Sequence, residues 1–193
     1  MGKHVIITVG RQFGSGGKQI AMAIGEKLGI KVYDNEILSE AARMSGFSKD
    51  IFETRDEKRR LWGIGYPSGL NDTDLFRMQS DVIRDIASRE DAIFLGRAAD
   101  YVLRDMDCLD VFVWAPMEVR KNNVCAREGI APDEAESYIF KKDRKRAEFY
   151  NFFTFGHWGK ASGYDLCIDS SILGIEGTAD FIIEFGHRCG KIL

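Results

Sequence analysis

A glycine cluster followed by a lysine is the part of this sequence best suited to chemistry. It reads Gly14-Ser15-Gly16-Gly17-Lys18-Gln19. Residues without a Cβ let several backbone N–H groups converge on one anion, and the N-terminus of a following helix adds partial positive charge. Lys18 would add a full charge. The cluster therefore predicts a phosphate-binding loop over residues 14–19, and a simple tight turn is the alternative.

The cluster departs from the strict phosphate-binding loop motif, in which a second glycine is followed by lysine and then by serine or threonine. If Gly16 takes the place of that glycine, Gly17 stands where the lysine belongs and Lys18 where the Mg²⁺-binding hydroxyl belongs. Ser15 is out of register for that hydroxyl. The sequence thus keeps the backbone features of such a loop but displaces its functional side chains.

Two further charged residues directly follow short predicted strands. Asp34 and Arg97 therefore lie at the carboxyl ends of strands, where ligands bind in open α/β sheets. Asp34 either hydrogen-bonds a substrate or caps the next helix. Arg97 either binds phosphate or carboxylate through its planar guanidinium, or pairs with Asp100 or Asp105. Both residues are candidates for binding an acceptor molecule.

Basic residues gather in the segment 120–150. It starts at Arg120 and carries five cations around one acid in the run 141–146. Asp143 and Arg146 are three residues apart, so on a helix they share a face. A solvated helix face is one interpretation. The other is a lid, because phosphoryl transfer needs several cations around the equatorial oxygens and must exclude water.

Three other segments leave alternatives open. The charged segment 48–61 is either a solvated helix or a flap over the acceptor, and the glycine-rich segment 62–74 is an irregular loop. The aromatic segment 148–159 either stacks on a base or forms a core or subunit contact. His157 has no nearby nucleophile, so we assign it no catalytic role.

The elements that must position these residues alternate along the chain. Apolar and β-branched runs predict strands over about 4–9, 31–33, 92–95, 109–114 and 164–168. Helical patterns lie between them: one over about 16–28 ending at Gly29, one from Asp74 capped by Asp72 or Thr73, one with Pro116 at its first position that ends at Gly129, and one that begins at Pro132. This alternation predicts a parallel sheet with helices on both faces.

The composition places limits on the class of protein. A chain of 193 residues with 45% hydrophobic and 30% charged residues fits one domain, 1–193. The net charge of −3 argues against a nucleic-acid partner. The four cysteines lie far apart, so neither a disulfide framework nor a metal site is predicted. No apolar run approaches the ~20 residues that cross a membrane. We therefore expect a cytoplasmic protein without a membrane partner.

Five stretches together resemble the cytidylate kinase-like branch of the P-loop nucleoside monophosphate kinases. They are GSGGKQIAMAIGEKLGIKVYDNEIL, IFLGRAADYVL, DVFVWAPMEVR, DRKRAEFY and YDLCIDSS, in the family's order. The resemblance implies the three-layer P-loop fold with a five-stranded parallel sheet in the order 2-3-1-4-5. It also implies an acceptor-binding insertion at about 34–74 and a lid at about 120–150.

The resemblance further implies phosphoryl transfer from ATP, with Mg²⁺, to a nucleoside monophosphate such as CMP or dCMP. Lys18, Arg120 and Arg146 would then be catalytic, residues 14–19 would bind the donor phosphates, and four residues would bind the acceptor: Asp34, Arg97, Asp143 and Arg146. Ala98 stands where the cytidylate kinases carry an acid, and Ile139 where they carry an arginine.

These departures leave two alternatives to a cytidylate kinase. One is a nucleotide-binding regulatory module with little kinase activity, and the other is a kinase for a different small acceptor. Nothing in the sequence indicates an oligomeric state, and a homodimer is one option.

Overall fold

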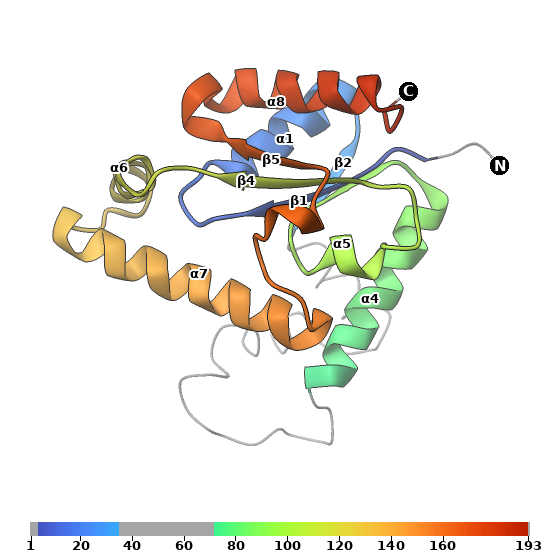
Figure 1. Ribbon diagram of the computed structural model, residues 1–193, viewed down its shortest axis with the longest axis horizontal. Helices are drawn as coiled ribbons and strands as arrows, with labels where there is room; N and C mark the ends of the chain where they lie inside the picture. The colour runs from blue at the N-terminus through green and yellow to red at the C-terminus, as the bar shows by residue number, and fades with distance from the viewer. Residues whose placement is uncertain (1–3, 35–71, 193) are drawn as a thin grey trace.

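The computed structural model describes residues 4–34 and 72–192, and its centre is a five-stranded parallel sheet (Figure 1). The strands are β1 (Ile6–Arg11), β2 (Lys31–Tyr33), β3 (Ala92–Phe94), β4 (Leu109–Trp114) and β5 (Leu166–Asp169). Their order is β2-β3-β1-β4-β5, and every neighbouring pair is parallel. The predicted fold class and sheet order are confirmed.

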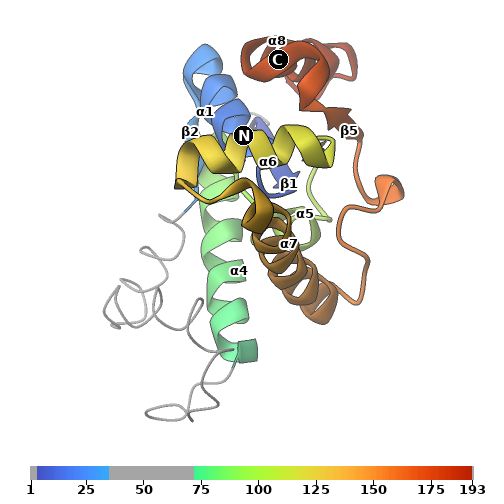
Figure 2. The ribbon, with the colours of Figure 1, turned by 90° about the vertical axis from the view of Figure 1, so that its left-hand side faces the viewer.

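Helices cover both faces of the sheet. They are α1 (Gly17–Leu28), α4 (Asp72–Arg89), α5 (Ala99–Val102), α6 (Met117–Glu128), α7 (Pro132–Thr154) and α8 (Ser170–Arg188), with a short 3₁₀ turn at Ala161–Gly163. Figure 1 shows α1 and α8 on one face and α4 and α5 on the other. The long helix α7 begins next to α6 and runs along the same side as α4 (Figures 1 and 2). The segment between β4 and β5 thus runs along the carboxyl ends of the strands.

The alternation of side chains along β1 divides the core between the two faces. Ile7 and Val9 point toward α1 and α8, where they pack with residues such as Ile24. Ile6 points the other way and packs with residues of α4 such as Ile83. A strand buried on both faces needs an almost continuous apolar run, which is the pattern that the sequence shows here.

Glycine and proline signals placed several helix ends correctly. Gly29 and Gly129 end α1 and α6 in the left-handed conformation, with φ of 68° and 67°. Such a residue lets the last carbonyls find partners without a steric penalty from Cβ. Pro132 is the first residue of α7. These three positions fix the lengths of the helices that flank the glycine loop and the cleft.

Several boundaries differ from the sequence predictions. Pro116 is the N-cap of α6 and not its first helical residue, and α4 begins at Asp72, so the expected cap lies inside the helix. Strand β1 extends to Arg11 because β4 continues beside it, pairing Gly10 with Phe112 and Arg11 with Val113. Arg11 is consequently held by the sheet, directly before the glycine loop.

Part of the predicted acceptor-binding insertion, including the proposed flap at 48–61 and the loop up to residue 71, lies outside the described residues. Among the residues that are described, no helix is long and apolar enough to cross a membrane.

Candidate active site

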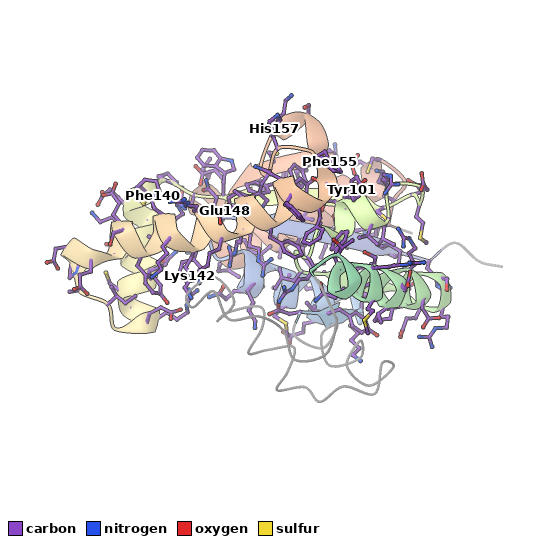
Figure 3. All side chains as sticks on the ribbon, turned by 90° about the horizontal axis from the view of Figure 1, so that it is seen from below. Tyr101, Phe140, Lys142, Glu148, Phe155 and His157 are labelled. Atoms are coloured by element: carbon purple, nitrogen blue, oxygen red, sulfur yellow. The ribbon has the colours of Figure 1, made fainter. Side chains whose placement is uncertain are left out.

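The glycine loop and α7 face each other across a cleft at the carboxyl ends of the strands. Residues from α1, α4 and the segment after β3 complete its walls. Of the residues singled out from the sequence, eight line it: Gly14, Gly16, Gly17, Lys18, Gln19, Asp34, Arg97 and Arg146. Figure 3 views α7 from below, and two of its labelled side chains, Lys142 and Glu148, also line the cleft. One cleft therefore collects most of the predicted site.

The glycine loop has a shape that side chains would disturb. Gly14 and Gly16 have φ of +82° and +78°, which L side chains rarely adopt. A Cβ on Gly14 would lie 2.8 Å from the carbonyl oxygen of Arg120, and one on Gly17 would lie 2.6 Å from Cβ of Arg11. These glycines are required both by backbone conformation and by close approach of neighbouring chain segments.

The loop leads into a helix N-terminus that is open to an anion. Helix α1 begins at Gly17, its N-cap Gly16 provides no side-chain hydrogen bond, and its first turn contains no acidic residue. The first N–H groups of a helix have no partner within the helix, and its dipole favours negative charge there. Lys18 and Gln19 stand exposed in the same turn. The N-terminus of α1 therefore has the donors and the charge that suit a phosphate group.

Ser15 lies behind the loop and not in the cleft. Its side chain is buried, and its hydroxyl donates to the carbonyl oxygens of Gln12 (2.9 Å) and Val113 (3.2 Å). Its own carbonyl accepts a hydrogen bond from Oγ of Ser170 at 2.6 Å. Ser15 therefore anchors the loop to β4 and α8, and it does not line the cleft.

Cationic side chains crowd around one carboxylate beside the loop. Nζ of Lys18 lies 3.0 Å from Oδ2 of Asp34, and Nη2 of Arg11 lies 3.9 Å from Oδ1 of the same carboxylate. Arg146 reaches in from α7 and donates through Nη1 to the carbonyl oxygen of Arg11 at 2.9 Å. Arg97 lines the cleft next to them. We call Lys18, Asp34, Arg11, Arg97 and Arg146 the cleft cluster.

The cleft cluster is short of negative charge. Burial and the neighbouring guanidinium of Arg146 lower the pKa of Arg11 to about 9, and the charge of Asp34 only partly opposes them. Burial also lowers the pKa of Arg146, against the attraction of Asp143 and Asp34. A cation whose pKa is lowered by burial and like charges is stabilised when an anion arrives. Perturbed groups of this kind gather at functional sites.

Arg120 and Asp143 form a separate ion pair, with 2.5 Å between Nη1 and Oδ2. Their side chains are only 7% and 14% exposed, and neither residue lines the cleft. Asp143 also accepts the backbone N–H of Phe13 at 2.6 Å, and Arg120 approaches the Phe13 carbonyl at 3.5 Å. The pair thus fastens the glycine loop to α6 and α7. A direct contact of either residue with a nucleotide would require the pair to separate.

The aromatic segment divides into two parts. Phe149 and Phe153 pack against Phe76 of α4, with 4.3 Å between the ring centroids of Phe76 and Phe153, and all three line the cleft. Phe155, labelled in Figure 3, is 93% exposed just beyond α7. The segment therefore contributes aromatic rings both to the cleft wall and to the exposed surface, and base stacking and a subunit contact stay predictions.

Arg11 is the main site residue that the sequence predictions missed. It occupies the last position of β1, where a charged residue follows a run of buried apolar ones. That change from apolar to cationic at a strand end was the available signal, the same one that identified Arg97.

Comparison with known proteins identifies the family. A model described as the cytidylate kinase-like family matches residues 6–172. The cytidylate kinase of Methanopyrus kandleri is 30% identical over 177 residues, 86% of this chain and 85% of that protein. An uncharacterized protein from Eubacterium ventriosum has a TM-score of 0.75 at 26% identity, covering 94% of this chain and 98% of that one. The shikimate kinase of Bacteroides thetaiotaomicron has the same fold, with a TM-score of 0.58 at 16% identity over 95% and 98% of the two chains. This chain belongs to the cytidylate kinase-like family.

Proposed function

We propose that this protein is a nucleoside monophosphate kinase that transfers the γ-phosphoryl group of ATP to CMP or dCMP. One observation carries the proposal: an uncapped glycine-rich helix N-terminus and a cationic cluster with a single shared carboxylate face the same cleft. The names of the curated relatives support the acceptor. The phosphates of the donor and of the acceptor are both anionic in such a reaction, and this cleft contains cations that can bind each of them.

The donor phosphates bind at the glycine loop in this proposal. The amides of Gly14, Gly16 and Gly17 surround the β-phosphate, and Lys18 and Gln19 approach from the first turn of α1. Ser15 contributes by holding the loop in shape through its buried hydroxyl. Lys18 gives up its contact with Asp34 in exchange for a phosphate oxygen.

The acceptor phosphate binds between Arg97 and Arg146, with Arg11 beneath them. An oxygen of that phosphate attacks the γ-phosphorus, the bond to the β-phosphate breaks, and ADP leaves. Arg146 stabilises the charge that spreads over the equatorial oxygens during transfer. Asp34 keeps Lys18 and Arg11 in place before the substrates arrive and orients the acceptor. For Arg120 and Asp143 the geometry favours positioning of the loop over the substrate contacts expected from the sequence.

The described residues do not provide a site that would hold Mg²⁺ by itself. The hydroxyl of Ser15 is turned inward, and no group of three or more acidic, histidine or cysteine side chains surrounds an ion position in the described part of the chain. Mg²⁺ commonly keeps several waters and binds to substrate phosphates. We therefore expect the ion to enter with ATP, and no step above depends on a protein ligand to it.

The test is to mix the purified protein with Mg-ATP and, in separate reactions, CMP, dCMP, UMP, AMP, GMP or shikimate, and to measure the rate at which ADP forms. The proposal predicts ADP formation with CMP or dCMP. Binding of ATP without turnover would instead support a regulatory module, which the displaced lysine and the missing loop hydroxyl favour. Turnover only with another acceptor would support a kinase of different specificity.

A further inference from the structure

A second polar group lies in the cleft and has no part in the phosphate chemistry described above. Asp100 on α5 accepts a hydrogen bond from the hydroxyl of Tyr150 on α7, with 2.6 Å between Oδ2 and the phenolic oxygen. Both residues line the cleft, and so does Tyr164 from the segment before β5. The Asp100–Tyr150 pair therefore brings a carboxylate from one wall into contact with the opposite wall.

Asp100 keeps the capacity to accept another hydrogen bond. A carboxylate offers about four acceptor positions, and the groups that oppose its raised pKa are the Tyr150 hydroxyl and the backbone N–H groups of Asp100 and Tyr101. Burial raises that pKa. Within residues 4–34 and 72–192, no lysine or arginine forms an ion pair with Asp100. A partly buried acceptor without a cationic partner gains from a ligand that donates a hydrogen bond.

The position of the Asp100–Tyr150 pair relative to the cleft cluster indicates which chemical groups a ligand of the cleft would carry. Asp100 follows Arg97 by three residues along the chain, and the guanidinium of Arg97 lies 6.0 Å from the ring centroid of Phe149. Tyr150 is the next residue after Phe149 on α7. Arg97, Phe149 and Asp100 thus bring a cation, an aromatic ring and a carboxylate to the same cleft. The arrangement fits a ligand with an anionic group, a flat ring and, at the far end, a hydrogen-bond donor.

We propose that Asp100, positioned by Tyr150, binds the exocyclic amino group of the acceptor base and thereby selects a base with an amino group over one with an oxo group there. The inference rests on the proposed function, because it takes the acceptor phosphate to bind at Arg97 and Arg146. An oxo oxygen in the same place would face a carboxylate, and neither group can donate. Sites built to pair a specific hydrogen-bonding group reject the analogue without it by large factors.

CMP and UMP differ in this respect, so the ratio of their kcat/KM values is the measurement. We expect the wild-type protein to prefer CMP by roughly 10²-fold or more. In Asp100→Asn the side-chain amide can both donate and accept, so the ratio falls to within about 10-fold, mainly through kcat/KM for CMP. Tyr150→Phe releases the carboxylate from its partner and lowers the ratio less.

Asp105→Asn is the matched control, since Asp105 is exposed just beyond α5 and does not line the cleft. It should leave the ratio unchanged. Melting temperatures identify variants that fail to fold, and Tyr150→Phe provides a second variant if Asp100→Asn does so. Folded variants that keep the wild-type ratio would overturn the inference, and so would a wild-type protein that uses UMP as well as CMP.

The inference and the proposed function can fail separately. If the wild-type protein phosphorylates no nucleoside monophosphate, the proposed function is wrong, and calorimetric binding of CMP and UMP then decides the inference. Tighter binding of CMP that is lost in Asp100→Asn supports it. Equal binding of the two nucleotides, or a preference that persists in Asp100→Asn, contradicts it.

Discussion

The two charged groups on either side of the glycine loop use the same residue types for different purposes. Behind the loop, Arg120 and Asp143 are matched one to one, almost completely buried and hydrogen-bonded to the loop backbone. In front of it, Arg11 and Lys18 share Asp34, Arg146 is attracted by both Asp143 and Asp34, and the pKa of Arg11 is lowered to about 9 by burial and Arg146. A matched pair presents no net charge to a ligand, whereas a group with excess positive charge attracts an anion.

The difference also separates the expected consequences of mutation. Removing one partner of a buried pair leaves the other charge uncompensated in a poorly hydrated place, so stability suffers. Removing one cation from a crowded cluster relieves repulsion, so the fold tolerates it while anion binding does not. The predictions below test this separation, beginning with the largest expected effect.

Arg146→Ala should lower kcat by roughly 10³-fold or more, because arginines that stabilise the transferring phosphoryl group contribute that much. The dissociation constant of ATP should change by only a few-fold, since Arg146 is assigned to the acceptor side. Steady-state kinetics and calorimetry measure the two quantities. Lys141→Ala, at an exposed position of the same helix outside the cleft, is the control. Equal losses in turnover and ATP binding would contradict the assignment.

Arg120→Ala should destabilise the protein by about 3–5 kcal/mol, because it leaves the Asp143 carboxylate buried without its cation. Urea unfolding gives the free energy. The control is Arg144→Ala, which breaks an ion pair with Glu148 on the same helix whose side chains are 81% and 42% exposed. We expect a loss below about 1 kcal/mol there. Similar losses in both variants would remove the contrast between the buried pair and ordinary surface charges.

Gly14→Ala should weaken ATP binding by roughly 10-fold or more, about 1.4 kcal/mol. Its Cβ would meet the Arg120 carbonyl in a backbone conformation that alanine avoids, so the loop must change shape. Calorimetric titration with ATP measures the effect. Gly163→Ala, where a Cβ meets nothing within 4 Å, should bind like the wild type. If Gly14→Ala binds ATP normally, the loop amides do not hold the donor.

Asp110→Asn tests a partly buried carboxylate that has no arginine partner. Burial raises the pKa of Asp110 to about 6, although the Thr8 hydroxyl donates to it at 2.6 Å. The folded state then holds a proton that the unfolded state releases near pH 4, so this residue costs stability as pH rises from about 4 through 6. The variant should therefore melt about 2–4 °C above the wild type at pH 8, and the difference should vanish near pH 4.

Thermal melts of the wild type and of Asp110→Asn at each pH between 4 and 8 isolate the effect of titrating Asp110. Asp105→Asn, at an exposed position, should show no such pH-dependent difference. A gain from Asp110→Asn that stays constant between pH 4 and 8 would show that the carboxylate has an ordinary pKa.

The fold could be predicted from the sequence because its signals are local. Glycines with φ above +60° end α1 and α6, Pro132 starts α7, and apolar runs mark the strands. The strand order could not be predicted from local signals, because periodicity allows several orders. The family resemblance selected one of them. The extension of β1 to Arg11 was missed because it depends on the neighbouring β4.

The candidate site was predictable as a set of residues but not as a set of partners. Lys18, Asp34, Arg97 and Arg146 were each recognisable by their place after a strand, in the loop or on a basic helix. That Arg120 and Asp143 would meet could not be predicted, because they lie 23 residues apart on two helices whose packing the sequence does not specify. Helical spacing placed Asp143 and Arg146 on one face, and both bind the backbone just before the glycine loop, at Phe13 and Arg11.

The hydrogen bonds that hold the glycine loop have a consequence for the order in which the protein is made. The loop leaves the ribosome early, but the side chains that anchor its backbone follow much later: Asp143 is 130 residues beyond Phe13, and Ser170 is 155 residues beyond Ser15. Contacts between such distant parts of a chain form late in folding. A nascent chain that ends before α7 carries the glycines without the Asp143 bond, and one that ends before α8 still lacks the Ser170 bond, so the loop acquires its full set of anchors only after both helices have been made.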